Sequence, residues 1–263
     1  MKYIICFLLS LSSQGFAQSE NLARFYAPTV VQGEGTDPQA DQFTKVDFDH
    51  DWVGDNNWKN MLHFPRPRTV YYDVIEGEKH YFITYAFFYP RDYAAVCFWV
   101  HCHENDLEGM KVVVEKPNKI VRMETLAHNY RKVVLNPKEI SIVIEKEGHG
   151  IHPKGLRKPD KKNVVYQPQD YDLLPIKDLW NKRNSQVFKG SFLFRGKRLP
   201  SGFRTSKWSS SIGGARPPWS WEVKGLDRPK GTWFLDPAAG TNEKYISNTY
   251  LNELFLPELA TIK

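Results

Sequence analysis

The 263-residue chain contains only three cysteines, too few for a disulfide-built fold. Cys6 lies in an apolar run at the N-terminus, so Cys97 and Cys102 remain for the rest of the chain. Two cysteines cannot staple a domain of this size, and the core must therefore be hydrophobic. Their five-residue spacing allows them to pair only if the chain turns between them, so both the paired and the free state stay open.

The sequence also lacks the short motifs of several large protein classes. It has no G-x-S-x-G, no H-E-x-x-H and no phosphate-binding glycine loop, so no common hydrolase or nucleotide-binding class is indicated. Zinc-finger, helix-turn-helix and RNA-binding motifs are missing too, and no nucleic-acid partner is expected. These absences favour a binding protein over an enzyme.

The N-terminus has the order of a cleavable signal peptide. Lys2 precedes an apolar run over residues 4–11, and Gly15 and Ala17 place small residues at the −3 and −1 positions of a cleavage site. The run is far shorter than the ~20 residues that span a bilayer. We therefore predict a signal peptide over residues 1–17, one domain over residues 18–263, and a secreted or periplasmic protein.

The remaining sequence predicts a mostly β protein. Runs rich in β-branched and aromatic residues are bounded by turn formers, whereas helical periodicity is weak. This pattern favours a single-domain β-sandwich with long loops and a few short helices, the best helix candidates being residues 172–182 and 242–254. Long loops are expected over 146–176 and 195–230. The expected strands are residues 69–74, 80–89, 110–115, 119–123, 139–145 and 187–194.

The charge of the chain is mildly positive. The formal net charge is +6 and falls to +5 when Lys2 leaves with the signal peptide. The excess is spread along the chain with a cluster at residues 154–162, which would suit an anionic membrane surface, a glycan or a wall polymer, or would simply aid solubility.

One stretch, residues 85–114, concentrates groups that bind cations or move protons. Asp92 follows an expected strand, and His101, His103, Glu104, Asp106 and Glu108 precede the next. In a strand, the period of two puts Asp106 and Glu108 on one face, and likewise His101 and His103. Carboxylates with an imidazole suit Mg²⁺, Ca²⁺ or Mn²⁺, and Zn²⁺ less well without a thiolate. The alternative is a polar turn whose charges pair with nearby arginines and lysines.

The same stretch resembles the core motif of the necrosis- and ethylene-inducing-peptide-like proteins, a family of secreted cytolysins. That family has Y-x-W-Y-x-P-K-D and then G-H-R-H-D-W-E running into G-V-V-V; this chain has YAFFYPRD over 85–92, HCHENDLEG over 101–109 and KVVV over 111–114. Val100 and Leu107 depart from the pattern, and one residue is inserted. A vacuolar-sorting-type β-sandwich family is a related resemblance.

The resemblance implies a β-sandwich that holds a divalent cation and recognises the sugar headgroup of a membrane sphingolipid. By motif position, the implied metal ligands are Asp92, His101, Asp106 and Glu108. The inserted residue leaves open whether His101 or His103 is the imidazole ligand.

Three further features are candidates for binding. Trp219 and Trp221 would share one face of a strand and could stack on a sugar, with core packing as the alternative. His149 could line the mouth of the site, although an exposed loop position is the preferred interpretation. The aspartates of residues 47–57 do not match an EF-hand, and they suggest either a second Ca²⁺ site or a turn capped by its own side chains.

Three functions follow from the sequence. The preferred one is a metal-dependent, cytolysin-like protein that binds a membrane glycolipid or surface glycan. The second is a metal-dependent hydrolase of a phosphodiester or glycan, with Glu104 or His103 as general base. The third is a structural envelope protein that the metal stabilises.

Overall fold

The computed structural model describes residues 17–93, 102–128, 130–187, 192–194 and 197–199. Trp219, Trp221, His101 and Cys97 lie outside these residues, as does the helix expected over 242–254. Cys102 is buried and disulfide-bonded.

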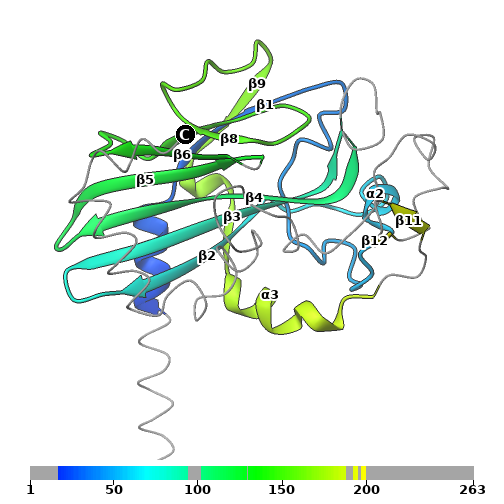
Figure 1. Ribbon diagram of the computed structural model, residues 1–263, viewed down its shortest axis with the longest axis horizontal. Helices are drawn as coiled ribbons and strands as arrows, with labels where there is room; N and C mark the ends of the chain where they lie inside the picture. The colour runs from blue at the N-terminus through cyan, green and yellow to red at the C-terminus, as the bar shows by residue number, and fades with distance from the viewer. Residues whose placement is uncertain (1–16, 94–101, 129, 188–191, 195–196, 200–263) are drawn as a thin grey trace, which may run out of the picture.

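Two mixed β-sheets form most of the molecule (Figure 1). The larger sheet has the strand order β10-β2-β3-β4-β5-β6, and the smaller has the order β8-β7-β1-β9. The strands of the larger sheet are β2 (Thr69–Glu76), β3 (His80–Asp92), β4 (His103–Glu115), β5 (Lys119–Ala127), β6 (Tyr130–Leu135) and β10 (Asp172–Pro175). Those of the smaller sheet are β1 (Thr29–Gly33), β7 (Ser141–Ile144), β8 (Ile151–Pro153) and β9 (Asn163–Tyr166).

Helical structure is short within the described residues. Residues 17–25 are helical, and the other helices are α2 (Asn57–Asn60), α3 (Ile176–Lys182) and the 3-10 turns η1 (Pro168–Asp170) and η2 (Arg183–Ser185). A small hairpin pairs β11 (Phe192–Phe194) with β12 (Lys197–Leu199). No helix in the described part of the chain is long and apolar enough to cross a membrane. The prediction of a mostly β protein with two sheets and few short helices is confirmed.

Most expected strands are present, but their limits differ. β4 begins at His103 rather than at residue 110, because its polar first half continues the antiparallel ladder with β3. Residues 146–176 are not a long loop, because they contain β8, β9, η1 and β10. The helix expected over 172–182 begins only at Ile176, since Asp172–Pro175 pair in parallel with β2.

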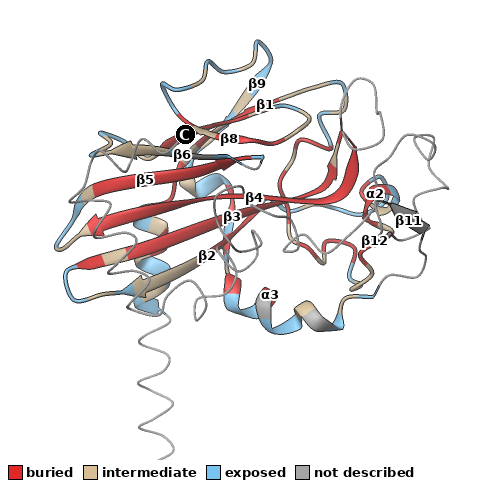
Figure 2. Cartoon of the chain, in the orientation of Figure 1, coloured by how far each residue is buried: buried red, intermediate tan, exposed pale blue. Residues whose placement is uncertain are grey.

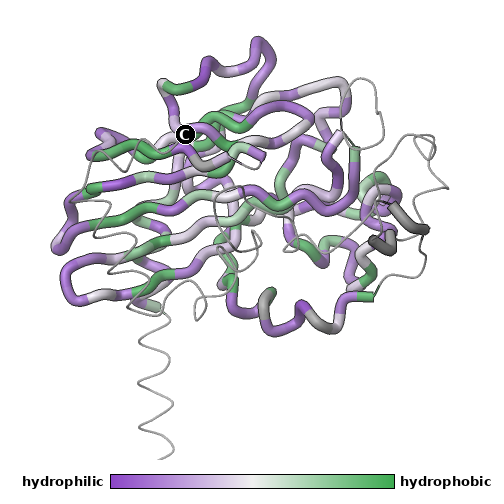
Figure 3. Tube along the Cα trace, viewed as in Figure 1, coloured by the Kyte–Doolittle hydropathy of each residue, from purple (hydrophilic) through white to green (hydrophobic). Residues whose placement is uncertain are grey.

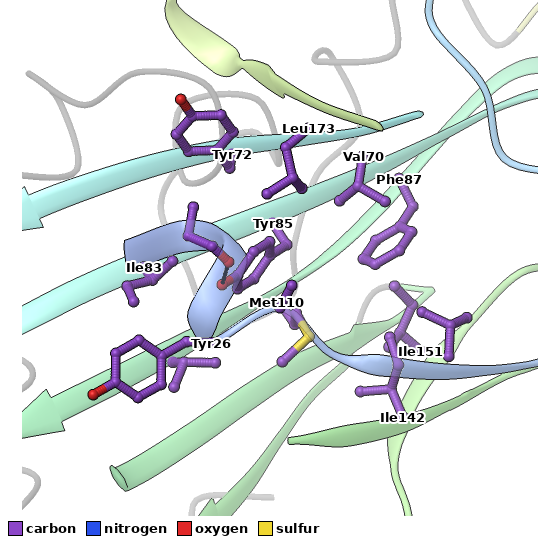
Figure 4. Packing of buried hydrophobic residues seen from close by; sticks show 14 of the residues in the cluster. Tyr26, Val70, Tyr72, Ile83, Tyr85, Phe87, Met110, Ile142, Ile151 and Leu173 are labelled. Atoms are coloured by element: carbon purple, nitrogen blue, oxygen red, sulfur yellow. Dashed lines mark hydrogen bonds between the residues drawn. The ribbon is translucent and has the colours of Figure 1, made fainter. Parts of the chain in front are cut away.

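The main core lies between the two sheets. Figure 4 shows apolar side chains of β2, β3 and β4 meeting those of β7 and β8, with Tyr26 from the N-terminal segment beside them. A second cluster covers the opposite face of the larger sheet and includes Phe88, Leu107 and residues of α2 and α3. Figure 2 shows β3 and β4 buried along most of their length. Burial on both faces allows long apolar runs in these strands without strict alternation.

Substitution of Phe87 tests the packing of the main core. It is fully buried, and its ring meets that of Phe43 edge to face at 5.3 Å. Phe87→Ala should lower the free energy of unfolding by about 3–5 kcal/mol, because it removes buried area and leaves a cavity. Urea unfolding of the mature protein measures this, with the exposed Leu156→Ala as a control that should change stability by less than about 0.5 kcal/mol. A loss for Phe87→Ala no larger than that of the control would contradict the assigned packing.

Candidate metal centre

The site lies where β3 ends and β4 begins. Asp92 is the last residue of β3 and His103 the first of β4, and the two are partners in the antiparallel register. Their side chains meet, with His103 Nε2 lying 3.2 Å from Asp92 Oδ2. Further along the same pair of strands, Asp106 of β4 is paired with Tyr89 of β3.

Asp92, His103 and Asp106 converge on one point. Each offers a ligand atom, and the three atoms lie within 4.8 Å of one another. Among the described residues, no other group of three or more His, Cys, Asp or Glu side chains meets this condition. His103 and Asp106 are buried and Asp92 is partly exposed, so the cluster opens toward solvent through Asp92.

The backbone of Asn105 explains how two residues three apart reach the same point. Asn105 has a positive φ of 63°, and it lies opposite Pro90, between two register pairs. Its side chain donates to Gly54 O at 2.5 Å, while Glu104 accepts from Trp58 N at 2.5 Å, so successive side chains reach the same loop. The alternation of side chains between the two faces of β4 is therefore interrupted at Asn105. As a result, His103 and Asp106 lie on the same side of the strand. An asparagine suits this position because its short side chain tolerates a left-handed backbone.

The structure thus places His103 in the cluster, whereas His101 lies outside the described residues. Glu108, the fourth ligand that the resemblance implies, follows Asp106 at the strand period of two but is not one of the three converging residues. It is buried opposite Phe87, and its charge acts on His128 and on Tyr89.

His149 does not occupy the exposed loop position that its sequence context predicted. It is completely buried rather than exposed in a loop, and its ring stacks on Tyr89 with centroids 3.7 Å apart and planes 1° apart. Nδ1 lies 3.3 Å from Asp106 Oδ2, and Nε2 lies 3.4 Å from Asp41 Oδ1. His149 therefore cannot meet a ligand from solvent, but it holds a member of the cluster.

Asp41 contacts the ring of His149 on the side opposite Asp106 and is itself held by hydrogen bonds. Its carboxylate accepts from Glu147 N at 2.6 Å, from Gly35 N at 2.7 Å and from the hydroxyl of Tyr93 at 2.8 Å. Burial alone would raise the pKa of Asp41, but the hydrogen bond and charge of His149 outweigh it and lower the pKa. Burial would likewise lower the pKa of His149, but Asp106 and Asp41 raise it to about 10. His149 is therefore an imidazolium at neutral pH.

The signal that could have located His149 is the sequence Gly148-His149-Gly150. A Cβ on Gly148 would lie 2.9 Å from a ring carbon of His128, and one on Gly150 would lie 3.1 Å from His128 Nε2. The two glycines thus allow the β7–β8 turn to pack closely against the end of β5. This close packing brings His149 under the larger sheet.

A second polar group lies at the rim of the site and joins the two sheets. Glu145, after β7, contacts His128 Nε2 at 2.9 Å, His152 Nε2 at 2.7 Å and Arg157 at 2.9 Å. The hydrogen bond to Glu145 is the main cause that raises the pKa of His128 to about 8, with smaller contributions from the charges of Glu108 and Asp106. Burial would raise the pKa of Glu145, but its two histidine partners hold it well below the usual value.

Glu104 points away from the cluster. Burial raises its pKa to about 8, against the hydrogen bond from Trp58 N, and Asp55 and Asp49 act on it more weakly. Since Glu104 faces the Trp58 loop and His103 belongs to the cluster, neither general base considered for a hydrolase is placed as a spare group beside the cluster.

Asp49 and Asp51, two of the aspartates of residues 47–57, accept hydrogen bonds from nearby residues of the chain. Asp51 Oδ1 accepts from Val53 N at 2.8 Å, Asp51 Oδ2 accepts from Asn56 at 2.8 Å, and Asp49 accepts from Asn60 at 2.7 Å. Hydrogen bonds of this kind are typical of a turn capped by its own aspartates.

His128 gives a pH prediction. Its pKa is about 8 in the folded protein and about 6.5 when unfolded, so its contribution to stability is fully present below pH 6.5 and is lost as the pH rises through 8. The stability difference between wild type and His128→Gln should therefore shrink between pH 6 and about 9. Denaturant unfolding across this range measures it, with the exposed His63→Gln as control. A difference that stays constant with pH would show that His128 is not paired with Glu145.

Comparisons with known proteins give one kind of match. No family model and no curated protein matches the sequence. Solved structures do match. One is "Toxin fold for microbial attack and plant defense", with 17% identity over 59% of this chain and 72% of that chain and a TM-score of 0.38. Another is Necrosis and Ethylene inducing Protein 2 from the causal agent of cocoa's Witches Broom disease, with 13% identity over 63% of this chain and 81% of that chain and a TM-score of 0.41. "NLPPya in complex with glucosamine" also matches (15%, 60% and 73%, TM-score 0.37). One of these structures is a necrosis- and ethylene-inducing protein, the family that the sequence motif resembles.

Proposed function

We propose that this chain is an exported, cytolysin-like binding protein that holds a divalent cation with Asp92, His103 and Asp106. The observation that carries the proposal is their convergence within 4.8 Å at the ends of β3 and β4. In this proposal the bound cation recognises a membrane glycolipid or surface glycan, the ligand that the motif resemblance implies.

The chemistry of the donor set fits a hard or borderline cation. Two carboxylates and one imidazole suit Mg²⁺, Ca²⁺ or Mn²⁺, which keep several water ligands, and suit Zn²⁺ less well. Asp106 and Asp41 bring two negative charges close to one histidinium, His149, and Asp92 adds a third carboxylate to the cluster. Because like charges at short range repel, an additional cation would relieve the site.

The residues have distinct roles in this proposal. Asp92, Asp106 and His103 would be the ligands, and Asp92 is the one nearest to solvent. His149 and Asp41 fix the orientation of the Asp106 carboxylate, as outer partners do in metal sites. When bound, the cation would supply open coordination positions for sugar hydroxyl groups in place of water.

Export belongs to the same proposal. Residues 1–17 would be removed as a signal peptide, and the helix over 17–25 would then begin at the new N-terminus. This helix belongs to the folded domain, because Ala23 is fully buried and its carbonyl accepts from the hydroxyl of Tyr85 at 2.7 Å. Cleavage after Ala17 would leave these contacts intact.

Metal content tests the site. The purified mature protein should retain about one divalent ion, whereas Asp92→Asn/Asp106→Asn should retain none, because it loses both charged ligands. Elemental analysis after dialysis against each candidate metal gives the result. The control is Asp172→Asn/Asp178→Asn, which removes the same charge from two exposed positions on β10 and α3.

Vesicle binding tests the ligand. Wild type should bind phosphatidylcholine vesicles that carry a glycosylated sphingolipid, and EDTA or Asp92→Asn/Asp106→Asn should abolish this binding. If the metal raises the melting temperature but no glycolipid or soluble glycan binds, the cation is structural and the envelope-protein hypothesis holds. If the wild type retains no metal, the cluster is a polar turn and the proposal fails.

His149→Gln gives a separate prediction. Glutamine cannot carry the positive charge that joins Asp106 to Asp41, so the affinity for the cation should fall by about 10–100-fold without loss of any ligand. Isothermal titration with the metal identified above measures the change. A variant at the partly buried His152, His152→Gln, should bind metal nearly as tightly as wild type, since His152 contacts Glu145 rather than the cluster.

A further inference from the structure

The segment between β8 and β9 is the most basic part of the described surface. Residues 154–162 hold five basic residues and one acidic residue, a formal charge of +4: Lys154, Arg157, Lys158, Asp160, Lys161 and Lys162. All four lysines are exposed. Lys154 and Lys162 pair with Glu139 and Glu34, but within the described residues Lys158 and Lys161 make no ion pair. In Figure 1 this connection projects beyond the sheets, and Figure 3 shows it as mainly hydrophilic.

A single leucine is exposed within this basic segment. The side chain of Leu156 is 59% exposed, and it belongs to none of the hydrophobic clusters of the described residues. A tight turn holds it there, since Leu156 N donates to Pro153 O at 3.1 Å and Gly155 has a φ of +96°. The left-handed backbone of Gly155 favours glycine, so the turn that presents Leu156 is built into the sequence.

A basic surface around an exposed leucine matches one kind of partner better than others. A soluble polyanion or wall polymer needs only the positive charges and gains nothing from Leu156. At an anionic lipid bilayer, lysines bind the headgroups while an apolar side chain enters the boundary with the acyl chains. We propose that residues 154–162 dock the protein on an anionic lipid bilayer, with Leu156 as the inserted side chain.

The docking surface is connected to the metal centre. Arg157 pairs with Glu145, Glu145 pairs with His128, and the charges of Glu108 and Asp106 act on His128. Docking would therefore hold the metal centre near the bilayer that carries a glycolipid. The contact itself needs no cation, so this inference goes beyond the proposed function and can fail or succeed independently of it.

The test is co-sedimentation of the mature protein with lipid vesicles in EDTA, which removes any contribution from the metal centre. Wild type should bind vesicles of phosphatidylcholine with phosphatidylglycerol, should bind pure phosphatidylcholine far more weakly, and should be released by salt. Lys158→Glu/Lys161→Glu should lower the partition coefficient about tenfold or more. Leu156→Ser keeps the charge and should lower it about fivefold or more.

Matched controls separate a local surface from general charge. Lys59→Glu/Lys177→Glu makes the same charge change at exposed positions on α2 and α3, and Leu62→Ser replaces a leucine that is 56% exposed. Both controls should bind nearly as wild type does. All substituted residues are exposed, and unfolding curves that match wild type will show that each variant is folded.

Three results would overturn the proposal. The first is no binding of wild type to phosphatidylglycerol vesicles. The second is equal losses for the control and test lysine pairs, which would mean that only net charge matters. The third is binding of Leu156→Ser at wild-type strength together with tight binding of dextran sulfate, which would assign the basic segment to a soluble polyanion.

Discussion

The buried imidazolium of His149 joins the parts of the molecule that form the site. It stacks on Tyr89 of the larger sheet, and it lies between Asp106 of β4 and Asp41, whose carboxylate receives backbone hydrogen bonds from both Gly35 and Glu147. A fully buried charge is tolerated only where opposite charges and hydrogen bonds compensate its loss of hydration. The carboxylates on both sides provide this compensation and raise the pKa of His149. The same contacts fix the direction of Asp106, so the geometry of the candidate metal centre depends on a residue that no ligand could touch.

Two groups of polar side chains lie near His149. The inner one is the converging group of Asp92, His103 and Asp106, which is where the acidity of the site is concentrated. The outer one is Glu145 with its histidine and arginine partners, which links the end of β5 to β7, β8 and the basic segment after β8. Charge therefore changes sign across a short distance, from an acidic centre to a cationic surface. An acidic centre suits a cation and its hydroxyl ligands, whereas the cationic surface suits anionic headgroups, so the two would contact different parts of one membrane.

The strands were predictable to a large extent because their composition is unusual. The run from His80 to Tyr89 and the run from Met110 to Glu115 are rich in β-branched and aromatic residues, and both lie inside β3 and β4. The polar first half of β4 was not predictable, because His103 to Gly109 has the composition of a loop. It is a strand because β3 continues alongside it and supplies hydrogen-bond partners over its whole length. The strands within 146–176 were missed for the same reason, since β9 gains its order from pairing with β1, far away in the sequence.

The sequence by itself located the candidate site in the motif from Tyr85 to Val114, and the resemblance implied Asp92, His101, Asp106 and Glu108 as ligands, with His103 as the alternative imidazole. It could not choose between His101 and His103, because the choice depends on the direction of each side chain. In the tertiary structure the left-handed backbone of Asn105 brings His103 to Asp106, whereas His101 lies outside the described residues. The tertiary structure also placed His149, which looks like an exposed loop residue in the sequence, in a fully buried position. Only the close packing of the glycines beside it against His128 shows that the turn is buried, and such long-range packing leaves no periodic signal in a sequence.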